Sequence, residues 1–132
     1  MRPRYIYNLN AMYSPQLLDH FQNPRNAGDV AGADAIVETA NPACGDMLRL
    51  SLKVADGRLT QIGFKAKGCV PSMACASALT EMVAGKTLLE ARTVSEHRDD
   101  LIAAVGGLPQ ASTHAAQLAL DALALALTQL RP

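Results

Sequence analysis

The sequence contains no tryptophan, and aromatic residues make up only 4% of its 132 positions. A surface that stacks nucleic-acid bases depends on aromatic side chains, so this composition argues against a protein that binds single-stranded nucleic acid by stacking. The chain also has no formal net charge, because 12 Lys and Arg balance 12 Asp and Glu. There is therefore no electrostatic case for binding nucleic acid or an anionic membrane.

Cysteine is scarce as well, with three residues at Cys44, Cys69 and Cys75. An odd number without a framework spacing does not suit a secreted disulfide scaffold. No long apolar segment follows the basic start of the chain, so we expect no signal peptide and a cytoplasmic protein. A Ser/His/Asp arrangement, a phosphate loop and a pair of carboxylates are also missing, and we do not expect an enzyme.

What is present fits one folded unit by its length. We predict a flexible arm at 1–12 and a single domain at 13–132. Leucines alternate with polar residues between positions 47 and 54, which is typical of a strand with one wet face. The Asp56-Gly57 pair is a hairpin signal that joins this strand to a second at 59–67. A third strand is predicted at 35–39.

Helices are predicted both before and after these strands in the sequence. A short helix begins after Ser14, which acts as its N-cap, and ends at Asn23-Pro24. The later ones are a helix at 71–84, a helical turn at 88–91, a helix at 96–105 capped by Ser95, and an apolar helix at 115–130. Strands followed by helices predict an α+β fold, a small antiparallel three-stranded sheet with helices packed on one face.

The corner from Gly68 to Pro71 is the first candidate for chemistry. Gly68 permits a tight turn, and Pro71 suits the first position of a helix. Cys69 therefore precedes a helix N-terminus, whose partial positive charge favours a thiolate over a thiol. A thiolate is both a nucleophile and a ligand for soft metals.

A second turn carries Cys44 and Asp46, a thiol and a carboxylate two residues apart. Its Asn-Pro and Cys-Gly-Asp steps are turn chemistry. A lone cysteine in a small protein is commonly a buried apolar group. Two cysteines on two turns beside glycine suit a shared soft cation better than a core.

Four separated motifs then resemble the U-type iron–sulfur cluster assembly scaffold family, the IscU, SufU and NifU N-terminal type. In chain order they are Asp19-His20-Phe21-x-Asn23-Pro24-Arg25-Asn26-x-Gly28, Ala43-Cys44-Gly45-Asp46, Phe64-x-x-x-Gly68-Cys69 and Gly85-Lys86-Thr87-Leu88. The resemblance covers about residues 13–130. Within the first motif, we interpret His20 as a residue that caps or packs locally rather than as a ligand.

The resemblance implies metal ligands at Cys44, Asp46, Cys69 and His114. It also implies a third cysteine directly after His114, where this chain has Ala115. Cys75, six residues beyond Cys69, leaves two interpretations open. It is either a core residue or an additional ligand that replaces the missing thiolate, and its place about 6 Å along the helix axis favours the core.

These ligands suit zinc or an iron–sulfur cluster, with Asp46 as the exchangeable ligand. The resemblance implies a cysteine desulfurase as sulfur donor and apo iron–sulfur proteins as acceptors. Three hypotheses follow: a cluster assembly scaffold, a zinc-bound persulfide acceptor for the desulfurase, and a degenerate relative that serves as an interaction module.

Overall fold

The computed structural model describes residues 12–41 and 45–130. The predicted arm at 1–12 lies outside these ranges except for Met12. Along the chain the elements are α2 (Pro15–Gln22), β1 (Ala35–Asn41), β2 (Asp46–Ala55), β3 (Arg58–Lys67), α3 (Val70–Val83), α4 (Leu88–Ser95), α5 (Arg98–Ala104), a 3-10 turn (Gln110–Ser112) and α6 (Thr113–Gln129).

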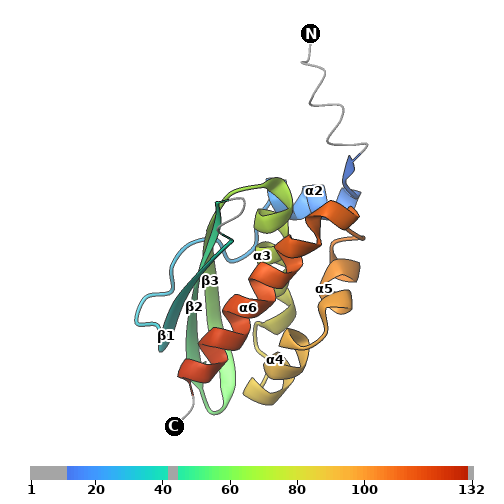
Figure 1. Cartoon of the computed structure of the whole chain (residues 1–132). Coiled ribbons are helices and arrows are strands. Elements are labelled where there is room, and N and C mark those ends of the chain that lie inside the picture. Colours follow the sequence, from blue (N-terminus) through green and yellow to red (C-terminus); the bar gives the residue numbers. More distant parts are fainter. Residues whose placement is uncertain (1–11, 42–44, 131–132) are drawn as a thin grey trace.

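The three strands form one antiparallel sheet in the order β1-β2-β3. In its centre Leu50 pairs with Val37 on one side and with Phe64 on the other, and all three side chains are buried. Helices α3 and α6 pack against the sheet, whereas α4 and α5 contact α6 farther out (Figure 1). The predicted α+β fold is confirmed.

The hairpin between β2 and β3 forms where it was predicted. Asp56 and Gly57 have φ values of 54° and 73°, and two adjacent left-handed residues are the requirement of a type I′ turn. Strand β1 runs to Asn41, two residues farther than predicted, because Asn41 still pairs with Asp46 at the start of β2.

The later helix predictions differ from the structure in their bounds: α3 and α6 start one and two residues earlier than predicted, and α4 and α5 differ as follows. The predicted turn at 88–91 is the eight-residue helix α4, which Thr87 and Glu90 begin with a reciprocal capping box. Ser95 does not cap the next helix but ends α4, where its hydroxyl donates to the carbonyl of Arg92 at 2.6 Å. Helix α5 starts only at Arg98.

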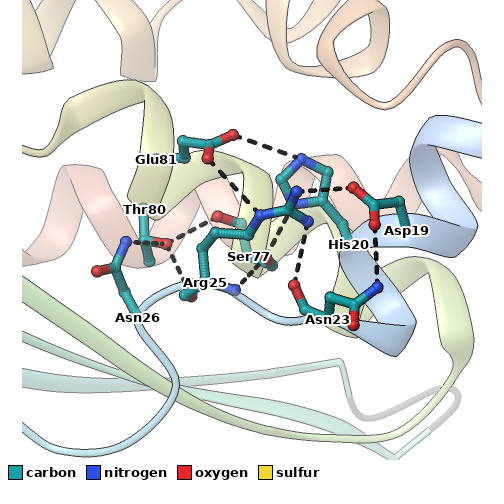
Figure 2. Close-up of polar contacts among 8 residues, drawn as sticks. All are labelled: Asp19, His20, Asn23, Arg25, Asn26, Ser77, Thr80 and Glu81. Carbon is teal, nitrogen blue, oxygen red and sulfur yellow. Dashed lines mark hydrogen bonds and ion pairs between the residues drawn. The ribbon is translucent and has the colours of Figure 1, made fainter.

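The segment after α2 is tied to the sheet and to α3. Phe64 exchanges backbone hydrogen bonds with it, donating to the carbonyl of Asn26 at 3.0 Å and accepting from the amide of Gly28 at 2.7 Å. A Cβ at Gly63 would lie 2.3 Å from the carbonyl oxygen of Gly28, so this close approach requires glycine. The same segment turns toward α3 (Figure 2).

Polar contacts lock α2 and this segment onto α3 (Figure 2). Nδ1 of His20 lies 2.8 Å from Oγ of Ser77, and the backbone amide of Arg25 donates to the same oxygen at 2.9 Å. Arg25 also pairs with Asp19 at 2.7 Å. The packing interpretation of His20 agrees with its 7% exposure, although its partner is on α3 rather than nearby in the sequence.

Candidate metal centre

The candidate site lies where β2 begins, β3 ends, and α3 and α6 begin, at the upper end of the molecule in Figure 1. Asp46 is the first residue of β2, Cys69 is the N-cap of α3, and His114 is in the first turn of α6. One ligand atom of each lies within 4.8 Å of the other two. The fold thus brings together three residues that are far apart in the sequence.

Asp46 is held at both carboxylate oxygens and is only 2% exposed. Oδ1 accepts from the backbone amide of Cys69 at 3.1 Å, and Oδ2 accepts from the hydroxyl of Ser72 at 2.6 Å. The start of α3 adds the partial positive charge of a helix N-terminus, which stabilises an anion.

Gly68 makes this arrangement possible. Its φ of 143° lies in the region that other residues rarely adopt. A Cβ at this position would lie 2.1 Å from Oδ1 of Asp46, far inside contact distance. The turn that was predicted for Gly68 therefore also serves the close approach of the backbone to a buried carboxylate.

The thiol of Cys69 faces the same carboxylate. Its Sγ donates to Oδ2 of Asp46 at 3.1 Å and lies 3.2 Å from Oγ of Ser72. Burial, chiefly, and the neighbouring Asp46 raise the pKa of Cys69, and the contacts of its sulfur with Ser72 offset only part of this. The expectation that the helix N-terminus favours a thiolate is therefore wrong, because burial and the anionic neighbour outweigh it.

His114 turns one ring nitrogen toward the site and the other away from it. Its Nδ1 lies 3.1 Å from the carbonyl oxygen of Ala111, which can only accept, so Nδ1 carries the proton. Nε2 then faces Asp46, 3.7 Å from Oδ2. A histidine whose outer nitrogen donates to a carbonyl is the usual arrangement of a metal ligand.

A hollow of about 360 Å³ opens over these groups. Its lining consists of Tyr13, Asp46, Gly68, Cys69, Pro71, Ser112 and His114. Cys69 and His114 are partly exposed there, so an ion or a small sulfur species can reach the candidate ligands from solvent.

Two cysteines that were considered as ligands, Cys44 and Cys75, are not part of the group formed by Asp46, Cys69 and His114. Cys44 lies outside the residues that the structure describes, directly before Gly45. Cys75 is fully buried in α3, and burial raises the pKa of its thiol to about 12. These surroundings are those of a core residue, and a ligand role for Cys75 stays a prediction. Ala115, at the position of the missing third cysteine, is 1% exposed.

Sequence reasoning missed Ser72, the residue that holds Asp46. Its spacing places it near Cys69, because a residue three positions after an N-cap returns to the start of the helix, but no pattern in the sequence signals its contact with Asp46. The other missed lining residues, Tyr13 and Ser112, carry no comparable pattern in the sequence.

One thiol, one carboxylate and one imidazole fit zinc or ferrous iron in their donor chemistry, and the thiol would bind as a thiolate. No helix able to cross a lipid bilayer is found among the described residues. The fold and this donor set together define a small α+β protein with a candidate metal centre at one end of its sheet.

Comparison with known proteins places the chain in a family. Residues 12–131 match the family described as NifU-like N terminal domain, and the chain belongs to it. It is 44% identical over 116 residues to the iron-sulfur cluster assembly scaffold protein IscU 1 of Archaeoglobus fulgidus, covering 88% of this chain and 74% of that one. The scaffold protein IscU of Aquifex aeolicus is 37% identical over 117 residues, covering 87% and 73% of the two chains.

A solved structure supports the fold. The crystal structure of a nitrogen-fixing NifU-like protein (N-terminal) from Brucella abortus superimposes with a TM-score of 0.75, covering 92% of this chain and 96% of that one. At 23% sequence identity this similarity concerns the fold alone. The resemblance inferred from the four motifs is confirmed by the family match.

Proposed function

We propose that this protein is an iron–sulfur cluster assembly scaffold, which receives iron and sulfur and passes the cluster to acceptor proteins. The observation that carries the proposal is the convergence of Asp46, Cys69 and His114 within 4.8 Å. Membership of a family whose relatives are named as such scaffolds supports it.

In this proposal the ligands divide the work of holding and releasing the cargo. Cys69, together with the predicted ligand Cys44, holds iron as a soft thiolate ligand. Asp46 is the exchangeable ligand, because a carboxylate is harder and binds iron of a cluster less firmly than a thiolate does. His114 completes the set with Nε2.

Sulfur would arrive by transfer from a persulfide on a cysteine desulfurase. The Cys69 thiol passes its proton to Oδ2 of Asp46, to which it already donates, and the resulting thiolate attacks the outer sulfur of the donor persulfide. A new S–S bond forms, the S–S bond of the donor breaks, and the donor leaves as a thiolate. The desulfurase makes the persulfide, so this chain is a carrier and not an enzyme in its own right. We place this chemistry in the cytoplasm, where thiols stay reduced.

A second candidate function is a zinc-bound persulfide acceptor for the same desulfurase. Ala115 favours it, since the position that would supply a third thiolate carries a methyl group. A mixed set of sulfur, nitrogen and oxygen donors is typical of a tetrahedral site that holds a single zinc ion, and zinc has no redox chemistry.

Anaerobic reconstitution with iron and sulfide, in parallel with zinc loading, tests the proposal. A scaffold is expected to give a stable visible charge-transfer spectrum that can be passed to an apo ferredoxin. Tight colourless zinc without a cluster would replace the scaffold by the second candidate. Binding of neither would leave only an interaction module.

Variants of the two described cysteines sharpen this test. Cys69→Ser is expected to abolish the cluster spectrum, because it removes a thiolate ligand. Cys75→Ala serves as the control, since its thiol is buried away from the hollow, and is expected to keep the spectrum. An intact spectrum in Cys69→Ser would contradict the proposed site.

A further inference from the structure

The hydroxyl of Ser72 lies among the candidate ligands while being hidden from solvent. Ser72 is in the first turn of α3 and is 4% exposed. Its Oγ is 2.6 Å from Oδ2 of Asp46 and 3.2 Å from Sγ of Cys69. A buried hydroxyl between two candidate ligands is placed to control how they face each other.

The two oxygens of Asp46 have different donors. Oδ1 accepts from the backbone amide of Cys69, a donor that the fold of the corner fixes. Oδ2 accepts from Ser72, the stronger contact by its 2.6 Å length. Rotation of the carboxylate about its Cβ–Cγ bond would break both hydrogen bonds, so the pair of donors sets its orientation.

Oδ2 is also the oxygen that faces the other candidate ligands. Sγ of Cys69 lies 3.1 Å from it and Nε2 of His114 lies 3.7 Å from it. The atom that Ser72 holds is therefore the one at the centre of the candidate metal group, and Oδ1 is turned toward the backbone.

We propose that Ser72 is a positioning residue that holds Oδ2 of Asp46 between Cys69 and His114 for metal binding. The inference rests on the proposed function, because the orientation matters only if the group binds metal. Hydrogen bonds that orient a ligand typically change metal affinity by about 10- to 100-fold when they are removed.

Ser77 provides a matched control on the same helix. It is also a fully buried serine, and its Oγ is hydrogen-bonded to His20 and to the amide of Arg25 (Figure 2). These contacts join α3 to α2 and to the segment after it, and they do not involve Asp46, Cys69 or His114. Ser77→Ala therefore removes a buried hydroxyl without touching the candidate ligands.

Zinc affinity by chelator competition and the cobalt(II) absorption spectrum, measured on the full chain, test this. Ser72→Ala is expected to bind zinc about 10- to 100-fold more weakly, with Ser72→Thr recovering part of the loss. Ser77→Ala is expected to lower the midpoint of thermal unfolding and keep the parent zinc affinity. Parent affinity in Ser72→Ala, or equal losses in both alanine variants, would overturn the proposal.

A double-mutant cycle shows whether Ser72 acts through Asp46. In an Asp46→Ala background, Ser72→Ala is expected to cause no further loss of zinc affinity, because the group it positions is gone. Independent losses that multiply in the double variant would mean that Ser72 acts on its own, contrary to the proposal.

A metal-free measurement separates this inference from the proposed function. The amide of Cys69 donates to Asp46, so freeing the carboxylate in Ser72→Ala is expected to shift the Cys69 amide resonance and speed its hydrogen exchange. If the parent binds neither zinc, cobalt nor a cluster, the proposed function fails. In that case the resonance and hydrogen exchange of the Cys69 amide still test the role of Ser72. If both were unchanged in Ser72→Ala, Ser72 would not position Asp46.

Discussion

At the scale of single residues, the candidate site depends on a position without a side chain. Gly68 combines a φ of 143° with a backbone so near Asp46 that a Cβ would lie 2.1 Å from Oδ1. Substitution there meets both backbone strain and a clash, and the clash is with the residue that the site is built around.

We therefore expect Gly68→Ala to lower both the free energy of unfolding and zinc affinity. The strained backbone alone costs about 1–3 kcal/mol, and the displaced carboxylate adds to it. Chemical denaturation and chelator competition measure the two effects.

Gly57→Ala separates strain from clash. Gly57 has a φ of 73°, but a Cβ added there would meet no atom within 4 Å, and the residue lies in the β2–β3 turn. This variant is expected to lose stability and keep zinc affinity. If Gly68→Ala also kept the parent zinc affinity, zinc binding would not depend on the present position of Asp46.

Cys75 is the residue on which a ligand role and a core role predict different outcomes. We expect Cys75→Ser to keep zinc affinity and to lose about 1–3 kcal/mol of stability, since the new hydroxyl has no assured partner in the core. Zinc competition and thermal unfolding, measured on the same sample, check this. A large loss of affinity with parent stability would make Cys75 the third thiolate.

The same thiol gives a pH dependence whose sign follows from its pKa. Burial raises the pKa of Cys75 to about 12, above the value of about 8.5 for an exposed thiol. Its contribution to stability is then complete below about pH 8.5 and is lost as the pH rises toward 12, because only the unfolded chain releases the proton there. Denaturant unfolding at a series of alkaline pH values measures this loss, and Cys75→Ala is expected to show a smaller loss, to which the raised pKa of Cys69 still contributes.

At the scale of elements, α4 shows how much a local signal contributes. Thr87 accepts from the amide of Glu90 at 3.1 Å, and the carboxylate of Glu90 accepts from the amide of Thr87 at 3.0 Å. We expect Thr87→Ala to cost about 1 kcal/mol of stability, the usual value of an N-cap, without changing zinc affinity. Denaturant unfolding measures it.

Thr93→Ala is the control on the same helix. Thr93 is exposed, and its hydroxyl donates to the carbonyl of Leu89 at 3.2 Å. A change within about 0.5 kcal/mol is expected for such a surface position. Equal losses of stability in the two variants would show that the capping box contributes no more stability than a single exposed hydroxyl contact.

The strands and the last helix could be predicted from the sequence because their signals are local. Alternating leucines mark β2, and Asp56-Gly57 marks its turn, whereas the start of α4 needed the pairing of Thr87 with Glu90 to be noticed. The candidate ligands Asp46, Cys69 and His114 could be predicted from the sequence motifs that resemble the scaffold family. The place of Ser72 beside Asp46 could not, because it depends on how the end of β3 turns into α3.

At the scale of the whole molecule, the candidate ligands come from three elements that meet only when the fold is complete. Asp46 belongs to the sheet, Cys69 to the corner before α3, and His114 to the first turn of α6. The unfolded chain has no such group, so it offers a metal ion no equivalent site.

This convergence links metal concentration to folding. An ion that binds only the folded chain stabilises it in proportion to the logarithm of its free concentration, by about 1.4 kcal/mol for each tenfold rise above the dissociation constant. The linkage also works in reverse: any event that separates the first turn of α6 from the sheet removes His114, while the hydrogen bond from the Cys69 amide keeps Asp46 beside Cys69. The ion then keeps a weaker site, so we expect local opening of this helix end to speed release of a bound ion without unfolding the protein.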